Sequence, residues 1–242
     1  MSTHRHKYPD AMQAAVACAN HLAGLLEEVL SGEGEVSLAL SGGVTPKLML
    51  PQLVEAKLPW ARVHIFLVDE RAVPPADPES NYKMLNEAFV VPAHFPHRNM
   101  HRIHAELRPD VAAKLYADEI REYFQLLPGE IPHFDVMQRG MGPDAHTASL
   151  FPGEPLIADR EGIAAAVYVE KLRQWRITML PGVLLAAHHT AMLVTGKDKA
   201  EAVRSVFRDT YDAMKFPAQI VTHHGRRVVW FMDEAAAANM DD

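Results

Sequence analysis

The sequence predicts a doubly wound α/β domain, in which a mostly parallel sheet carries helices on both faces. Short apolar runs alternate with stretches of helical periodicity along the 242 residues, which is the pattern of consecutive βαβ units. The apolar runs are nearly continuous, so we expect strands that are buried on both faces. With 48% of its residues hydrophobic, the chain can fill one sizeable core. We therefore expect one domain over residues 1–242.

An amphipathic helix opens the expected order of elements. Apolar residues recur at three- and four-residue spacing from Ala11 to Val29, and Ser31-Gly32 ends the stripe. The segment before it, Met1 to Pro9, is polar and lacks the apolar region of a signal peptide. No other apolar run approaches the ~18 residues that a membrane span requires. We expect a cytoplasmic protein with no membrane partner.

Strands are expected at the apolar runs, and helices in the stretches between them. The expected strands are Val36–Leu40, Val63–Val68, Phe134–Gln138, Ala164–Val169, Arg176–Met179, Ala191–Thr195 and Val228–Met232. The expected later helices are Pro46–Ala56, Asn81–Phe89, Pro109–Leu127, Pro181–Ala187, Lys197–Phe207 and Asp233–Ala238. Pro51 lies inside the first of these helices, where it must kink or shorten it. In such folds ligands bind beyond the carboxyl ends of the strands, so those loops should carry the chemistry.

Charge and cysteine content exclude several classes of function. The formal net charge is −7 and no run of basic residues exceeds two, so we expect no nucleic-acid partner. Cys18 is the single cysteine, which excludes a disulfide framework and a thiolate metal cluster. The closely spaced histidines lack the His-Glu-x-x-His or cysteine partners of a zinc site. We expect neither a metal nor a cofactor.

The loop Ser41-Gly42-Gly43-Val44-Thr45-Pro46 follows an apolar strand and precedes a helix that we expect to begin at Pro46. Glycines permit close backbone approach, and the free N–H groups of a helix start attract an anion. The pattern is neither a Walker A loop nor a dinucleotide fingerprint. It is compatible with a phosphate cradle and equally with an ordinary strand-to-helix turn capped by Thr45.

Three charged residues, Asp69-Glu70-Arg71, follow the next strand, and Ser80-Asn81-Tyr82 lies downstream. Charges at a buried strand end are costly unless they pair or bind a ligand, and a guanidinium can grip a carboxylate or phosphate with two hydrogen bonds. The alternative is a salt-bridged loop, with Ser80 capping the next helix.

The turn Asp144-Ala145-His146 follows the Phe134–Gln138 strand in a glycine-rich loop. A carboxylate that orients an imidazole provides a general base near neutral pH. Further basic groups, Arg176 and Lys199, occur near other strand ends. These cations either face a ligand or are simply solvated at the surface.

Together these motifs resemble the 6-phosphogluconolactonase family. The resemblance runs in the family's order over nearly the whole chain, through Ser41-Gly42-Gly43-x-Thr45-Pro46, Asp69-Glu70-Arg71-x-Val73-Pro74, Ser80-Asn81-Tyr82, Gly140 to Gly153, Arg176-Ile177-Thr178 and Gly196-x-x-Lys199-Ala200. It implies a Rossmann-like domain without a cofactor. It also implies hydrolysis of 6-phospho-D-glucono-1,5-lactone to 6-phosphogluconate in the oxidative pentose phosphate pathway. We expect a small-molecule partner and a monomer or small homo-oligomer.

The resemblance assigns a role to each motif. His146 would activate the water that attacks the lactone carbonyl, and Asp144 would orient it. Arg71 would line the site. The phosphate would be held by Ser41, Gly42, Gly43, Thr45, Arg176 and Lys199.

The sequence departs from the family pattern at three places. Val44 stands where a serine is usual, which removes a hydroxyl from the cradle. Ala145 replaces a glycine, so a positive φ there would cost ~1–2 kcal/mol. Gln138-Arg139 replaces an apolar pair, and Arg139 either adds a basic group to the pocket or forms a structural ion pair.

Two other functions remain as alternatives. The related glucosamine-6-phosphate deaminases typically carry a glutamate where this chain has Phe151, and a tyrosine where it has Arg71. A non-catalytic sugar-phosphate sensor would lack the base or carry a DNA-binding module, whereas this chain has His146.

Overall fold

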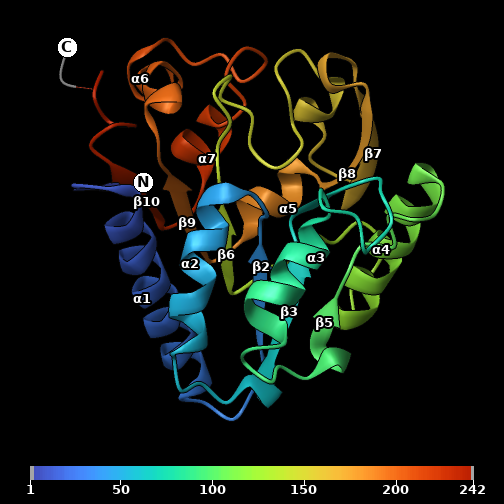
Figure 1. Cartoon of the computed structure of the whole chain (residues 1–242). Helices are drawn as coiled ribbons and strands as arrows, with labels where there is room; N and C mark the ends of the chain where they lie inside the picture. The colour runs from blue at the N-terminus through green and yellow to red at the C-terminus, as the bar shows by residue number, and fades with distance from the viewer. Residues whose placement is uncertain (1–2, 241–242) are drawn as a thin grey trace.

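A seven-stranded parallel sheet forms the centre of the computed structural model, which describes residues 3–240 (Figure 1). Its strand order is β1-β10-β9-β6-β2-β3-β5. The strands are β1 (His4–Tyr8), β2 (Val36–Leu40), β3 (Val63–Leu67), β5 (Met100–His101), β6 (Val136–Arg139), β9 (His189–Val194) and β10 (Val228–Asp233). The predicted single α/β domain with a mostly parallel sheet is confirmed.

Helices cover both faces of this sheet. Along β9, Ala191 and Leu193 pack in the same apolar cluster as helix α1 (Ala11–Leu30). The alternate residues, Met192 and Val194, pack with α6 (Ala200–Arg208) and α7 (Gln219–His224). This alternation is the period of two that a strand buried on both faces requires.

The remaining helices surround the sheet as Figure 1 shows. They are α2 (Val44–Val54), α3 (Asn81–Leu85), α4 (Pro109–Phe124) and α5 (Pro181–Ala186). A π-helical turn, Asn86–Val90, continues α3, and 3₁₀ turns occur at Trp60–Arg62, His97–Asn99, Pro155–Ala158, Glu170–Leu172 and Lys197–Lys199. Helix α2 begins at Val44 instead of Pro46, contains Pro51 and ends at Val54, two residues before the predicted end. Among the described residues, no helix is both long and apolar enough to span a bilayer.

A second, three-stranded antiparallel sheet lies beside the carboxyl end of the first. Its order is β4 (Asp69–Arg71), β8 (Gln174–Met179) and β7 (Ala164–Val169). Val68 joins the two sheets, because its N–H donates to Leu40 O at 2.9 Å and its carbonyl accepts from Met179 N at 2.9 Å. The strand predicted to end at Val68 therefore continues into the small sheet.

Two expectations at the chain ends were wrong. The polar segment His4–Tyr8 forms β1, a parallel edge strand against β10, although it has no apolar pattern. Asp233–Ala238 is not a helix, because Asp233 ends β10 and its carboxylate accepts from Gly196 N at 3.0 Å. The alanines that follow form successive turns, and Ala236 is fully buried.

Candidate functional site

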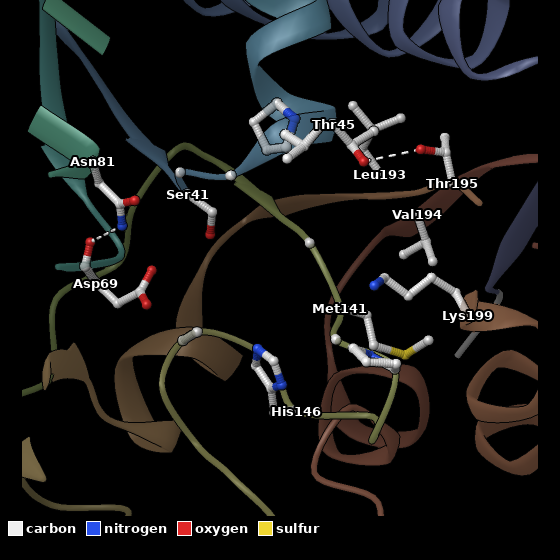
Figure 2. Close-up of a pocket in the computed structure, with 18 of the residues that line it drawn as sticks. Ser41, Thr45, Asp69, Asn81, Met141, His146, Leu193, Val194, Thr195 and Lys199 are labelled. Atoms are coloured by element: carbon white, nitrogen blue, oxygen red, sulfur yellow. Dashed lines mark hydrogen bonds between the residues drawn. The ribbon is translucent and has the colours of Figure 1, made fainter. Parts of the chain in front are cut away.

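A pocket of about 300 Å³ opens where the carboxyl ends of the parallel strands meet the small sheet. The loops after β2, β6 and β9 line it, together with residues of β4 and β8 (Figure 2). Of the residues assigned from the sequence, those that line the pocket are Ser41, Gly42, Gly43, Thr45, Arg71, His146, Arg176 and Lys199. Asp144 is not among the lining residues and contacts His146.

Glycines shape the loop that begins at Ser41. Gly43 is the residue before α2 and has a φ of +117°, which a side chain would strain. A Cβ on Gly42 would lie 1.9 Å from Asn81 Oδ1, so the neighbouring helix α3 approaches the bare backbone. Thr45 does not cap α2, and its hydroxyl lies 2.9 Å from that of Thr195 (Figure 2). Val44, at the family's serine position, is 85% exposed and lines the pocket with an apolar side chain.

Arg71 and Arg176 stand opposite each other in the β4–β8 pair. Side chains that face each other across antiparallel strands lie about 5 Å apart at Cβ, and two like charges there repel. Both Nε atoms are buried and have no hydrogen-bond partner within residues 3–240. Burial lowers the pKa of Arg176, and the charge of Arg71 lowers it further. Arg71 Nη1 donates to Glu79 O, and the remaining donors of the two adjacent guanidinium groups form a site for an anion.

The carboxylates beside these arginines already have partners. Glu70 accepts hydrogen bonds from the backbone N–H groups of Asn81 and Tyr82, both at 2.7 Å, and from Ser80 Oγ at 3.0 Å. It thus holds the start of α3, where Ser80 also caps the helix as expected. Burial raises the pKa of Glu70. Asp69 accepts from Ser149 Oγ at 2.6 Å, and its side chain borders the pocket (Figure 2).

The turn after β6 presents the imidazole of His146 to the pocket (Figure 2). Asp144 Oδ1 lies 2.5 Å from His146 Nδ1 and also accepts from the backbone N–H of His146 at 3.2 Å. A Cβ on Gly142 would lie 2.0 Å from the ring, so only glycine leaves room for it. Ala145 has a φ of +63° and is fully buried, so the strain expected there, ~1–2 kcal/mol, is present.

Burial changes the acidity of the candidate base. The pKa of His146 is lowered to about 4, chiefly by desolvation. The cations Arg176, Lys199 and Arg71 contribute to this lowering, and Asp69 opposes it. The sequence alone indicated an ordinary imidazole pKa near ~6.5, and that expectation was wrong. The imidazole is therefore in its neutral, proton-accepting form over a wider pH range than expected, but it is a weaker base than an ordinary imidazole.

Lys199 reaches the pocket from the turn after β9 (Figure 2). The turn is fixed by Gly196, whose N–H donates to both carboxylate oxygens of Asp233 at 3.0 and 3.1 Å and whose φ is +99°. Lys199 Nζ lies 2.5 Å from Asp198 Oδ2, and the Asp198 side chain is 64% exposed. A bound anion would compete with this exposed carboxylate for the lysine.

Arg139 has neither of the two roles considered from the sequence. Its side chain is 1% exposed and does not line the pocket. No carboxylate of the described residues pairs with it, and its Nη2 lies 3.4 Å from Leu184 O. Burial lowers the pKa of Arg139 to about 9. The guanidinium of Arg139 is thus a charge buried in the core without a carboxylate partner among the described residues.

Several residues at the site were given no role from the sequence. Phe151 lines the pocket, and its ring lies 4.2 Å from the imidazole of His146, centroid to centroid. Thr195 and Asn81 also line it. Lys171, far along the chain, contacts Asp144. Within the part of the chain that the structure describes, no group of three or more histidine, cysteine or acidic side chains could hold a metal ion.

The fold and the pocket define an α/β protein of the doubly wound class, with a basic pocket and an oriented histidine at the carboxyl edge of the sheet. The chain belongs to the family of glucosamine-6-phosphate isomerases and 6-phosphogluconolactonases, whose model matches residues 9–230. The resemblance inferred from the motifs is confirmed.

Individual relatives agree with this membership. The 6-phosphogluconolactonase of Nostoc sp. is 34% identical over 216 residues, which cover 89% of each chain. A crystal structure of 6-phosphogluconolactonase from Thermotoga maritima superimposes with a TM-score of 0.83 at 27% identity, covering 96% of this chain and 100% of that one. A monomeric glucosamine-6-phosphate deaminase, 18% identical, superimposes with a TM-score of 0.82 over 99% of this chain and 100% of its own. Fold alone therefore does not separate the two activities.

Proposed function

We propose that the protein is a 6-phosphogluconolactonase, which hydrolyses 6-phospho-D-glucono-1,5-lactone to 6-phospho-D-gluconate in the oxidative pentose phosphate pathway. The observation that carries the proposal is one pocket lined by two arginines with unpaired donors, Arg71 and Arg176, and by a base, His146. Relatives that bear the name of this enzyme match most of the chain, which supports the same substrate.

The proposed first step is attack of water on the lactone carbonyl carbon. A carboxylate only accepts hydrogen bonds, so Asp144 requires the proton of the imidazole on Nδ1, 2.5 Å away. The lone pair of His146 is then on Nε2, where it takes a proton from the attacking water. Hydroxide adds to the carbonyl carbon, and the carbonyl oxygen becomes the alkoxide of a tetrahedral intermediate.

The intermediate then collapses and breaks the bond between the carbonyl carbon and the ring oxygen. The imidazolium of His146 returns its proton to that oxygen, which leaves as the hydroxyl of the open chain. The phosphate, remote from the reacting bond, binds to Arg71, Arg176, Lys199 and the Ser41–Thr45 loop and supplies positioning energy.

A deaminase is the second candidate, because its fold is shared. The side chain stacked on His146 is Phe151, which cannot shuttle a proton. Of the described residues that line the pocket, Asp69 alone carries a carboxylate, and Ser149 Oγ donates to it at 2.6 Å. These contacts favour the lactonase. A sugar-phosphate sensor would bind without turnover.

The test is the rate of opening of freshly generated 6-phosphogluconolactone, with the spontaneous rate subtracted and glucosamine 6-phosphate assayed in parallel. We expect fast lactone opening and no ammonia release. Ammonia release from glucosamine 6-phosphate would make the protein a deaminase, and saturable binding without turnover would make it a sensor.

A second arm of the same assay tests metal independence. The base and the anion site are built from groups of the protein itself, so activity should survive exhaustive EDTA treatment and dialysis. Loss of activity that Zn²⁺ or Mg²⁺ restores specifically would contradict the metal-free mechanism.

A further inference from the structure

Lys171 is carried by the tip of the β7–β8 hairpin. The two strands pair over their full length, from Ala164 opposite Met179 to Val169 opposite Gln174. The tip is a single 3₁₀ turn, Glu170–Leu172. A short turn between fully paired strands has little freedom, so the small sheet determines where Lys171 lies.

From this tip Lys171 contacts two residues of the loop after β6. Its Nζ forms an ion pair with Asp144 Oδ2, and it lies 4.5 Å from the ring centroid of Phe151. Phe151 in turn stacks on His146, and Asp144 Oδ1 binds the imidazole Nδ1. Lys171 therefore contacts two neighbours of the imidazole, Asp144 and Phe151, and does not itself line the pocket.

We propose that Lys171 is a positioning residue for the His146 base: it anchors the free oxygen of Asp144 and offsets the charge of that carboxylate, so that the imidazole is held in place and stays uncharged. This inference rests on the proposed function.

Two physical effects lead to this role. A carboxylate bound through one oxygen can rotate about its terminal torsion, which is broad, whereas binding through both oxygens fixes it. A lone carboxylate 2.5 Å from an imidazole would also stabilise the imidazolium and raise the pKa of His146. The ammonium of Lys171 offsets that charge.

The other charges around the imidazole act on the same equilibrium. Burial and three cations lower the pKa of His146, and the carboxylate of Asp69 raises it; the cations are Arg176, Lys199 and Arg71. None of these is on the β7–β8 hairpin tip, so a substitution of Lys171 leaves them in place.

The experiment compares Lys171→Met with Lys171→Arg by two measurements. The first is titration of the His146 imidazole by NMR, which needs no turnover. The second is the pH profile of lactonase kcat/KM. In Lys171→Met we expect the imidazole pKa and the acid limb of the profile to rise together by about one pH unit. We also expect kcat at neutral pH to fall about tenfold with little change in KM, because the base is less well held.

Lys171→Arg keeps the charge and should leave both titrations at their original position. The matched control is Lys114→Met, because Lys114 also pairs with an aspartate, Asp118, at 2.5 Å, but on the exposed surface of α4. That variant should change nothing.

Three outcomes would overturn the inference: a His146 titration in Lys171→Met that coincides with the original, a shift that Lys171→Arg also shows, or a shift that Lys114→Met also shows. Failure of the lactonase assay with an intact NMR shift would reject the proposed substrate and leave the role of Lys171 standing.

Discussion

The two sheets contribute to the pocket in different ways. The parallel sheet acts through the loops that follow its strands: Gly42 and Gly142 make room, Gly43 adopts a positive φ, and backbone turns present His146. The antiparallel sheet acts through side chains on its strands, Arg71 and Arg176, and through Lys171 at its hairpin tip. We infer that the large sheet provides the base, the Ser41–Thr45 loop and one cation, Lys199, and that the small sheet adds the two arginines. Substitution of the base should therefore lower mainly kcat, and substitution of an arginine of the small sheet should raise mainly KM.

The largest expected effect belongs to the loop of the large sheet. His146→Gln should lower kcat by ~10²–10⁴-fold with a modest change in KM, because it removes the base and leaves the cations untouched. Asp144→Asn should cost less, since the ring remains but its tautomer is no longer set. A near-normal kcat of His146→Gln at saturating lactone would show that another residue is the general base, and Asp69 would be the next candidate.

Next in size is the loss of an arginine from the small sheet. Arg176→Ala should mainly raise KM, by one to three orders of magnitude or roughly 1.4–4 kcal/mol, if it binds phosphate equally in ground and transition states. Non-phosphorylated gluconolactone serves as the control and should be little affected. Equal losses of kcat/KM on both substrates would mean that Arg176 does not bind the phosphate. The different roles inferred for the two sheets would then be rejected.

A smaller effect is expected in the pH profile of the unmodified protein. The base must be neutral to act, and burial lowers the pKa of His146 to about 4, so the neutral form prevails above that pH. kcat/KM should stay level from neutrality to about pH 5 and fall as the pH drops further. An acid limb centred near ~6.5, the pKa of an ordinary imidazole, would show that the ring is not desolvated in solution.

The smallest kinetic effect is expected for the buried arginine of the large sheet. Arg139→Met replaces an unpaired core charge by an apolar chain of similar length and should raise the free energy of unfolding by about 1–4 kcal/mol. KM should not change, in contrast to Arg176→Ala. Denaturant unfolding and steady-state kinetics measure the two effects, and destabilisation or a raised KM would show that Arg139 has a partner or a ligand.

Sequence reasoning located most of the large sheet and of the site, because apolar runs and glycine-rich turns leave a local signal. It identified Ser41, Arg71, His146 and Arg176 before any geometry was known, and the structure brings all of them to one pocket. It also anticipated the strain at Ala145 as the consequence of a positive φ.

What sequence reasoning missed depends on contacts distant in the chain. Lys171 contacts Asp144 only because the β7–β8 hairpin folds over the loop after β6. The low pKa of His146 arises from burial and from cations of other elements. Strand β1 carries no apolar pattern, because its side chains are largely exposed and its place in the sheet depends on pairing with β10, far along the chain.

That pairing has a consequence for the order in which the protein can be built. Strand β1 is synthesised before every other strand, yet His4 to Tyr8 pair with Val229 to Asp233, near the opposite end of the chain. Helix α1 also packs against β10. During vectorial synthesis on a ribosome the inner strands β2, β3 and β6 can associate early, while β1 has no partner until β10 emerges. The β1 edge of the sheet therefore closes after the inner strands, and the contacts of Tyr8 with Phe231 form only once β10 has been synthesised.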